Sequence, residues 1–106
     1  MREFPTGAIR DDNKDKLNYD GALSPLVLER YAQYMHKCCT QKDGRKRTAG
    51  NWKKGFPKQE YMESMWRHFM EAWKIHWGAK GCIETSLCAL LFNVMGMLHV
   101  ILKEKK

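Results

Sequence analysis

Residues 51–77 read NWKKGFPKQEYMESMWRHFMEAWKIHW, and this stretch decides the fold. Pro57 is suited to the first turn of a helix, and Gly78 and Gly81 are suited to stop one. The stretch therefore predicts a helix from about Pro57 to about Trp77. An apolar stripe recurs along it at helical spacing, and we expect this stripe, with its Trp residues, to face the core: Met62, Met65, Trp66, Phe69 and Trp73.

Two further helices flank this one. Ser24 followed by Pro25 is a favourable start for a helix that should end near Thr40. A third helix should run from about Ile83 to Lys103 and is apolar nearly all round, which is typical of a helix buried in a bundle or between subunits. Polar residues interrupt its apolar run, which falls short of the roughly 20 residues of a membrane span, so we expect no membrane association.

The 106 residues form one domain, because a chain of this length has no room for a second core. The predicted class is all-α, with an irregular arm over residues 1–23 and a basic loop over residues 40–56. Three helices of this character need a partner subunit to cover them. We therefore expect a homo-oligomer, a dimer or a tetramer.

The net charge of +7 is large for this length and implies an anionic partner. The four Cys include no C-x-x-C spacing, which disfavours zinc, and adjacent Cys38 and Cys39 rarely bridge each other. No signal-like segment opens the chain. These features favour free thiols in a reducing cytoplasm.

Acids and a His follow one another along the central helix at spacings that place them on one continuous surface: Glu60, Glu63, His68 and Glu71. Carboxylates in this arrangement suit Mg²⁺ or Mn²⁺. The alternative is a solvated face on which Arg67 and Lys74 form ion pairs.

Asn93 stands in the middle of the apolar third helix. A buried amide must form hydrogen bonds or cost about 1–3 kcal/mol, so it holds either a neighbouring helix or a ligand. Glu84, nine residues earlier, lies about 180° around a straight helix and cannot share one metal with Asn93.

The basic loop offers cations for phosphate and a ring for a base: Arg45, Lys46, Arg47, Lys53, Lys54 and Trp52. The alternative is a solvated loop. Nucleic acid is the weaker ligand, since no recognition helix or RNA-binding signature accompanies the loop.

Five blocks along the chain carry a resemblance: GAIRDD with KLNYD, SPLVLERYAQYMHK, GNWKKGFP, YMESMWRHFMEAW and CALLFNVMGML. Together they resemble small phage proteins of the dATP/dGTP diphosphohydrolase-domain family, a branch of the MazG-like all-α nucleoside triphosphate pyrophosphohydrolases. The resemblance implies a small helical bundle completed by oligomerisation, with a nucleotide between helices and Mg²⁺ or Mn²⁺ on acidic residues. It also implies cleavage of a dNTP to dNMP and pyrophosphate, in the cytoplasm of an infected bacterial host.

Carried onto this chain, the resemblance assigns catalysis to His68 and Glu71, with His68 orienting a phosphate or water. The implied metal ligands are Glu60, Glu63, Glu71 and Glu84. The implied nucleotide-binding residues are Arg10, Lys16, Tyr19, Trp52, Lys54, Arg67 and Asn93.

One departure keeps a second function open. MazG-like enzymes carry a second acidic pair in the last helix, where this chain has Ser86, Cys88, Ala89 and Leu90. A binder needs cations and aromatic rings rather than a complete metal site. The alternative is therefore a metal-free, non-catalytic sponge that sequesters a cyclic-nucleotide or ADP-ribose-type immune signal and so blocks host antiphage defence.

Overall fold

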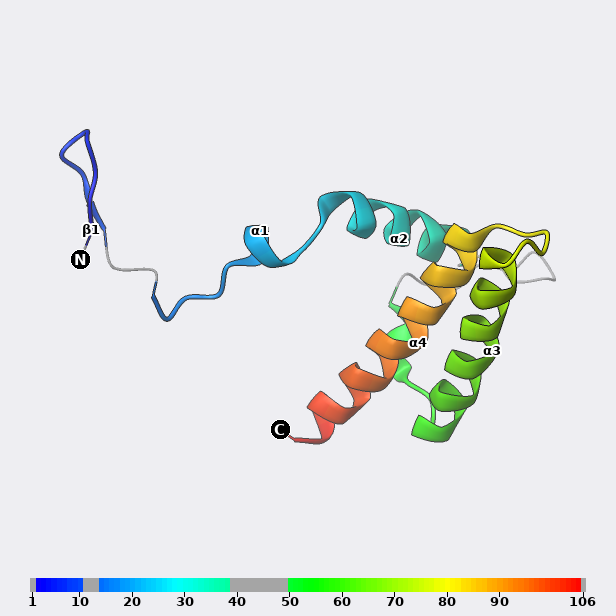
Figure 1. Ribbon diagram of the computed structural model, residues 1–106. Coiled ribbons are helices and arrows are strands. Elements are labelled where there is room, and N and C mark those ends of the chain that lie inside the picture. The colour runs from blue at the N-terminus through cyan, green and yellow to red at the C-terminus, as the bar shows by residue number, and fades with distance from the viewer. Residues whose placement is uncertain (1, 11–13, 39–49, 106) are drawn as a thin grey trace.

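The computed structural model describes residues 2–10, 14–38 and 50–105 and is predominantly helical (Figure 1). The described elements are β1 (Arg2–Glu3), β2 (Ile9–Arg10), α1 (Tyr19–Ala22), α2 (Pro25–Cys38), the 3-10 helix η1 (Asn51–Lys54), α3 (Lys58–His76) and α4 (Ile83–Glu104). The all-α class predicted from the sequence is confirmed.

Most helix ends lie close to where the sequence places them, and the predicted end near Thr40 lies outside the described residues. The Ser24 hydroxyl accepts a hydrogen bond from the Val27 amide at 3.3 Å and so caps α2. Pro57 precedes the first residue of α3, and Trp77 follows its last. The chain then turns through Gly78 and Gly81, whose φ angles of 108° and 149° are open to glycine but rarely to other residues.

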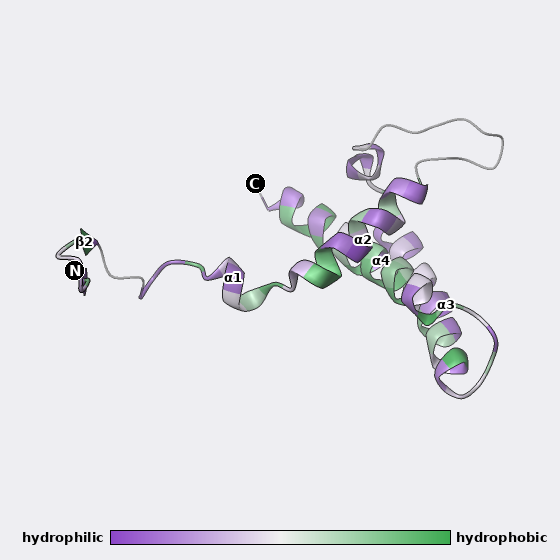
Figure 2. Ribbon diagram, turned by 90° about the horizontal axis from the view of Figure 1, so that it is seen from above, coloured by the Kyte–Doolittle hydropathy of each residue, from purple (hydrophilic) through white to green (hydrophobic). Residues whose placement is uncertain are grey.

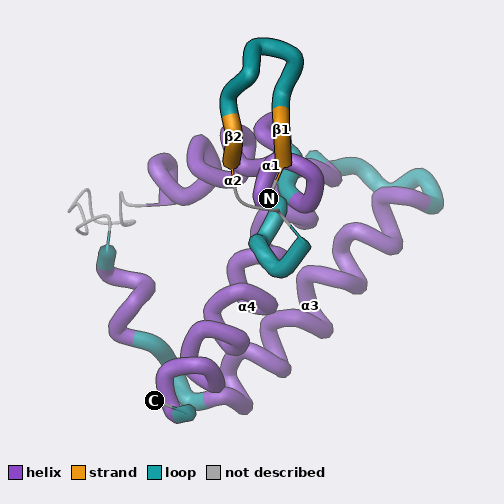
Figure 3. The backbone as a smooth tube through the Cα atoms, turned by 90° about the vertical axis from the view of Figure 1, so that its left-hand side faces the viewer, coloured by secondary structure: helices purple, strands orange, loops and turns teal. Residues whose placement is uncertain are grey.

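Helices α3 and α4 form an antiparallel hairpin and lie side by side along most of their length (Figures 1 and 3). Among the described elements, α2 packs only against α4, and it does so at the N-terminal turns of α4. There the Arg30 guanidinium meets the Glu84 carboxylate at 2.7 Å. Tyr34 of α2 is half-buried, and this burial, aided by a hydrogen bond with Cys38, raises its pKa to about 12.

The interface between α3 and α4 is built from small side chains. On α4 the buried positions Ser86, Ala89, Asn93 and Gly96 recur at spacings of three, four and three residues, which keeps them on one side of a helix. Gly96 lies under Tyr61, which is only 1% exposed. A Cβ at Gly96 would come within 2.6 Å of the Tyr61 ring, so glycine is what lets the two helices approach.

The Trp side chains lie elsewhere. Trp66, Phe69 and Trp73 are 62%, 52% and 51% exposed, so the prediction that this stripe faces the core is wrong. The side of α3 that packs on α4 carries Tyr61 and Ala72 instead, the two buried residues of that helix, and the Trp rings lie on a different side. We call the five residues Met62, Trp66, Phe69, Trp73 and Trp77 the Trp stripe.

The outer side of α4 is also apolar and exposed. Leu87, Val94 and Leu98 are 50%, 43% and 52% exposed, and Figure 2 shows the hydrophobic character of this helix. At 22 residues α4 is long and apolar enough to cross a membrane by length and composition. Length therefore does not exclude a span, contrary to the sequence argument, although buried helices of soluble proteins pass the same test.

The N-terminal arm extends away from the hairpin (Figure 1). Strands β1 and β2 pair antiparallel, with Arg2 opposite Arg10, in a small hairpin that the sequence did not predict. Among the described elements, neither these strands nor α1 contacts a helix of the hairpin. The radius of gyration is accordingly 18.9 Å, whereas a compact domain of this length has about 13 Å.

Candidate functional site

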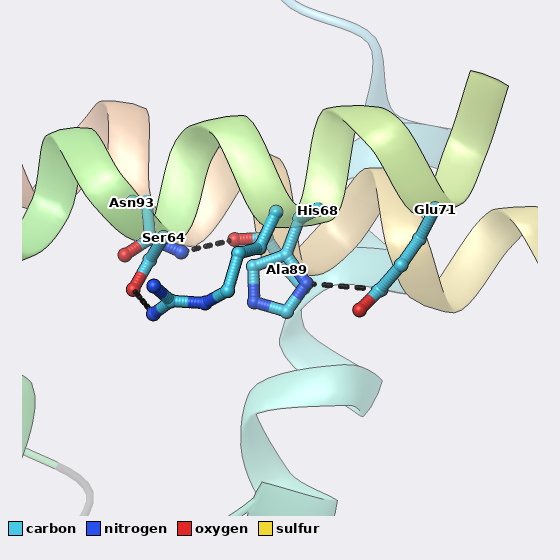
Figure 4. Close-up of polar contacts among 6 residues, drawn as sticks. Ser64, His68, Glu71, Ala89 and Asn93 are labelled. Atoms are coloured by element: carbon cyan, nitrogen blue, oxygen red, sulfur yellow. Dashed lines mark hydrogen bonds and ion pairs between the residues drawn. The ribbon is translucent and has the colours of Figure 1, made fainter.

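Polar side chains gather along one side of α3, and we call Ser64, Arg67, His68 and Glu71 the polar strip (Figure 4). His68 Nδ1 lies 3.2 Å from Glu71 Oε2. The Arg67 guanidinium donates to the Ser64 hydroxyl at 2.8 Å. The resemblance assigned three of these four residues to a site, and the fold makes those three neighbours. A cation, a proton-transfer group and a carboxylate thus lie within two turns of one helix.

Asn93 is buried, as its position in the apolar helix suggested. Its side-chain amide donates to the Ala89 carbonyl of its own helix at 2.8 Å. This bond offsets part of the desolvation cost that the amide would otherwise incur. Asn93 therefore has a structural role that needs no ligand.

A hollow of about 380 Å³ opens beside the strip, where α3 ends and α4 begins. We call it the loop hollow. It is lined by Glu71, Lys74, Ile75, Ala79, Lys80, Gly81, Cys82, Thr85 and Ser86. Glu71 belongs to both the polar strip and this lining, so the two surfaces are continuous. The volume lies at the lower end of the range for small-molecule sites.

Cys82 lies at the rim of the loop hollow, just before the first residue of α4, and is exposed. Hydrogen bonds from the Thr85 side chain and then the Thr85 backbone lower the pKa of its thiol. The start of a helix stabilises negative charge, as this shift illustrates.

The carboxylates assigned to metal do not meet in the described residues. Glu60 and Glu63 are exposed residues near the start of α3. Glu84 forms an ion pair with Arg30 of α2, and Glu71 pairs with His68. Within residues 2–10, 14–38 and 50–105, no group of three or more His, Cys, Asp or Glu could hold a metal ion.

The residues assigned to the nucleotide lie in three places: the arm, η1 and the hairpin of α3 and α4, which carries Arg67 and Asn93. Arg10, Lys16 and Tyr19 belong to the arm and are exposed. Trp52 packs edge-on against His99 of α4 with ring centroids 5.0 Å apart, and Lys54 shares the same 3-10 helix.

The groups on η1 are far from the loop hollow, and no described element of the arm contacts a helix of the hairpin. The segment η1 contacts α4 near His99, whereas the loop hollow is formed by the first turns of α4. From Thr85 to His99 a helix advances about 21 Å. The remaining cations of the predicted basic loop, Arg45, Lys46 and Arg47, lie outside the described residues.

A second hollow, of about 330 Å³, is almost wholly apolar. It lies between the Trp stripe and α4 and is lined by Met62, Met65, Trp66, Phe69 and Leu90. Its lining offers shape and dispersion contacts but no hydrogen bonds, which suits an apolar side chain better than a charged ligand.

Sequence reasoning missed the cations of the loop hollow. It treated Lys74 only as an ion-pair partner and gave no role to Lys80 or Thr85. Lys74 leaves the end of α3 and Lys80 leaves the turn, so their meeting depends on the path through Gly78 and Gly81. The available signal was two lysines placed around a Gly-rich turn that opens a long helix.

No family model, curated protein or solved structure was found to match the chain. The family resemblance therefore stays an expectation, and the function must be argued from the residues of the site.

Proposed function

We propose that this protein binds a phosphorylated nucleoside between α3 and α4 and holds it intact. The observation that supports the proposal is the continuity of the polar strip with the loop hollow through Glu71. Together they bring Arg67, Lys74 and Lys80 to one side of a protein whose net charge is +7. An anionic ligand of nucleotide size suits this surface in charge and volume.

The nucleoside end needs an aromatic surface. Trp77 follows Lys74 by three residues at the end of α3, so the two side chains are neighbours on the helix surface. Trp77 is 77% exposed and available for stacking. Stacking on a base is worth about 1–3 kcal/mol and tolerates different bases. Trp77 therefore replaces Tyr19 and Trp52 as our candidate for base stacking within one protomer.

Binding without cleavage is favoured by the position of the acids. A hydrolase of the resembled kind needs several carboxylates around Mg²⁺ or Mn²⁺. In this site Glu71 pairs with His68. Glu84 lies on the side of α4 that faces α2, where it pairs with Arg30. The proposed role is therefore that of a nucleotide sponge. From the resemblance we add its proposed setting, the cytoplasm of an infected bacterium, and its proposed purpose, removal of a nucleotide immune signal.

Cleavage to dNMP and pyrophosphate is the second candidate, because the His68–Glu71 contact is a suitable general-base pair. One experiment separates the two. The protein is incubated with dATP, dGTP, a cyclic dinucleotide or an ADP-ribose compound in the presence of Mn²⁺. After heat denaturation the ligand is identified by chromatography. We expect intact ligand. Pyrophosphate release that disappears in Glu71→Gln would establish the hydrolase instead.

We also propose that the protein acts as a homo-oligomer. The outer residues Leu87, Leu91, Val94, Leu98 and Ile101 of α4 are spaced by four, three, four and three residues, which is the heptad pattern of a helix that packs on another helix. We call them the outer seam. Three of the five residues, Leu87, Val94 and Leu98, are about half exposed. Pairing of two outer seams would join two α3–α4 hairpins in a four-helix bundle.

The exposed area supports this assembly. The chain exposes 9216 Å², whereas a compact monomer of this mass exposes about 6,200 Å². The excess, about 3,000 Å², includes the arm and is of the size that obligate dimers bury.

A further inference from the structure

We propose that the phosphoryl end of the ligand is bound in the loop hollow, at the N-terminus of α4, by Lys74, Lys80 and Ser86. This assignment rests on the proposed function, because it fixes which end of the nucleotide lies at the turn. Neither the sequence patterns nor the family resemblance assigned Lys74 or Lys80 to a ligand.

The buried Ser86 is the observation that points to a ligand. Its residue is only 6% exposed, yet it lines the loop hollow. Within the described parts of the chain, its hydroxyl has no hydrogen-bond partner. No described side-chain nitrogen or oxygen is both fully buried and without a hydrogen-bond partner, so this hydroxyl is open to the loop hollow. A phosphoryl oxygen in the hollow can accept its proton.

The start of α4 favours negative charge at the same place. The first backbone hydrogen bond of α4 runs from the Ser86 amide to the Cys82 carbonyl. The Glu84 and Thr85 amides before it hydrogen-bond with the Cys82 thiol, and the helix dipole adds to their effect. The lowered pKa of Cys82, which hydrogen bonds from Thr85 produce, is consistent with stabilised negative charge here.

Two ammonium groups complete the site. Lys74 and Lys80 both line the loop hollow, and no ion pair between either of them and a described carboxylate is formed. The nearest acid of the lining, Glu71, is held by His68 at 3.2 Å. A di- or triphosphate therefore meets two available cations and one hydroxyl, whereas an uncharged nucleoside gains nothing from them.

The test compares matched pairs of charge deletions. Lys74→Gln/Lys80→Gln removes two cations from the loop hollow, and Lys103→Gln/Lys105→Gln removes two from the far end of α4. Affinities for dATP, dAMP and deoxyadenosine are measured by calorimetry with each protein. We expect the first double variant to weaken dATP binding at least about tenfold, a loss typical of charged hydrogen bonds, and to bind all three compounds alike. The control should keep the wild-type preference for more phosphates.

Ser86→Ala keeps the packing and removes only the hydroxyl, so it should weaken dATP binding several-fold without changing the melting temperature. If the lysine pair can be removed with no change in the phosphate preference, the assignment is wrong while nucleotide binding stands.

A second readout does not need a nucleotide. Inorganic pyrophosphate in the loop hollow should slow alkylation of the exposed Cys82, measured by peptide mass spectrometry, while the buried Cys88 in the same peptide serves as an internal reference. If no nucleotide binds but pyrophosphate still protects Cys82, the anion site stands and the proposed function fails. If no nucleotide binds and pyrophosphate does not protect Cys82, the anion site and the proposed function are both wrong.

Discussion

The two sides of α4 differ in the size and the burial of their side chains. Its inner side, which meets α3, carries Ser86, Ala89, Asn93 and Gly96, all buried. Its outer side carries Leu87, Val94 and Leu98, which are about half exposed. The larger apolar side chains thus lie on the side that this chain alone leaves uncovered. The hairpin is held together by close approach of small residues, and most of its apolar surface remains available to a partner.

The largest effect is expected from substitutions that place charged side chains on the outer side of α4. Leu91→Asp/Leu98→Asp places carboxylates in the outer seam, where pairing with a second copy would bury them at a large cost. We expect the oligomer to dissociate to monomers at micromolar concentration, measured by light scattering after size exclusion. Helical content should hold, since neither residue belongs to the interface between α3 and α4.

Glu63→Asp, a change on the exposed face of α3, serves as the control and should leave the oligomer intact. A wild-type chain that is already monomeric would contradict the assembly. A chain that partitions into liposomes would show instead that a lipid surface covers α4.

The inner side is tested by a smaller change. Gly96→Ala places a methyl group within 2.6 Å of the Tyr61 ring and should cost about 1–3 kcal/mol of folding free energy, by the usual penalty for overpacking. Denaturant unfolding measures this directly. Val94→Ala, on the outer side of α4, is the control variant, and its unfolding is measured at the same protein concentration. An unchanged or raised stability of Gly96→Ala would show that the helices do not approach as described.

The smallest expected effect concerns Cys82. Because Thr85 lowers the pKa of this thiol, its alkylation rate should reach half its maximum below the ordinary thiol value of about 8.5. The thiolate is the reactive form, so the rate rises with pH through the lowered pKa. Thr85→Val removes the first cause and should move the midpoint upward. A midpoint that does not respond to Thr85→Val would contradict the described geometry at the start of α4.

The helices were predictable because their ends are marked locally. Ser24, Pro57 and Gly78 act through capping, ring geometry and positive φ, which depend on nearby residues alone. The burial of Tyr61 was not predicted, since periodicity identifies an apolar stripe without saying which neighbour it meets. A glycine inside a helix costs about 1 kcal/mol relative to alanine, so Gly96 was the available signal of close packing.

The candidate site was predictable only in part. The spacing of Arg67, His68 and Glu71 on one helix is fixed by 3.6 residues per turn, so the polar strip follows from sequence. The loop hollow does not, because it joins Lys74 to Lys80, Thr85 and Ser86 across a turn whose path depends on tertiary packing. The arm residues Arg10, Lys16 and Tyr19 make no contact that places them near either surface.

The central claim is that a phosphorylated nucleoside binds between α3 and α4. Calorimetric titration of nucleoside triphosphates, cyclic dinucleotides and ADP-ribose compounds into the full chain, with and without Mg²⁺, tests it most directly. We expect saturable heat for at least one of them in the absence of any divalent ion, with a weaker affinity for phosphorylated ligands in Lys74→Gln/Lys80→Gln. Titrations that give no heat with any of these compounds, with or without Mg²⁺, would contradict it.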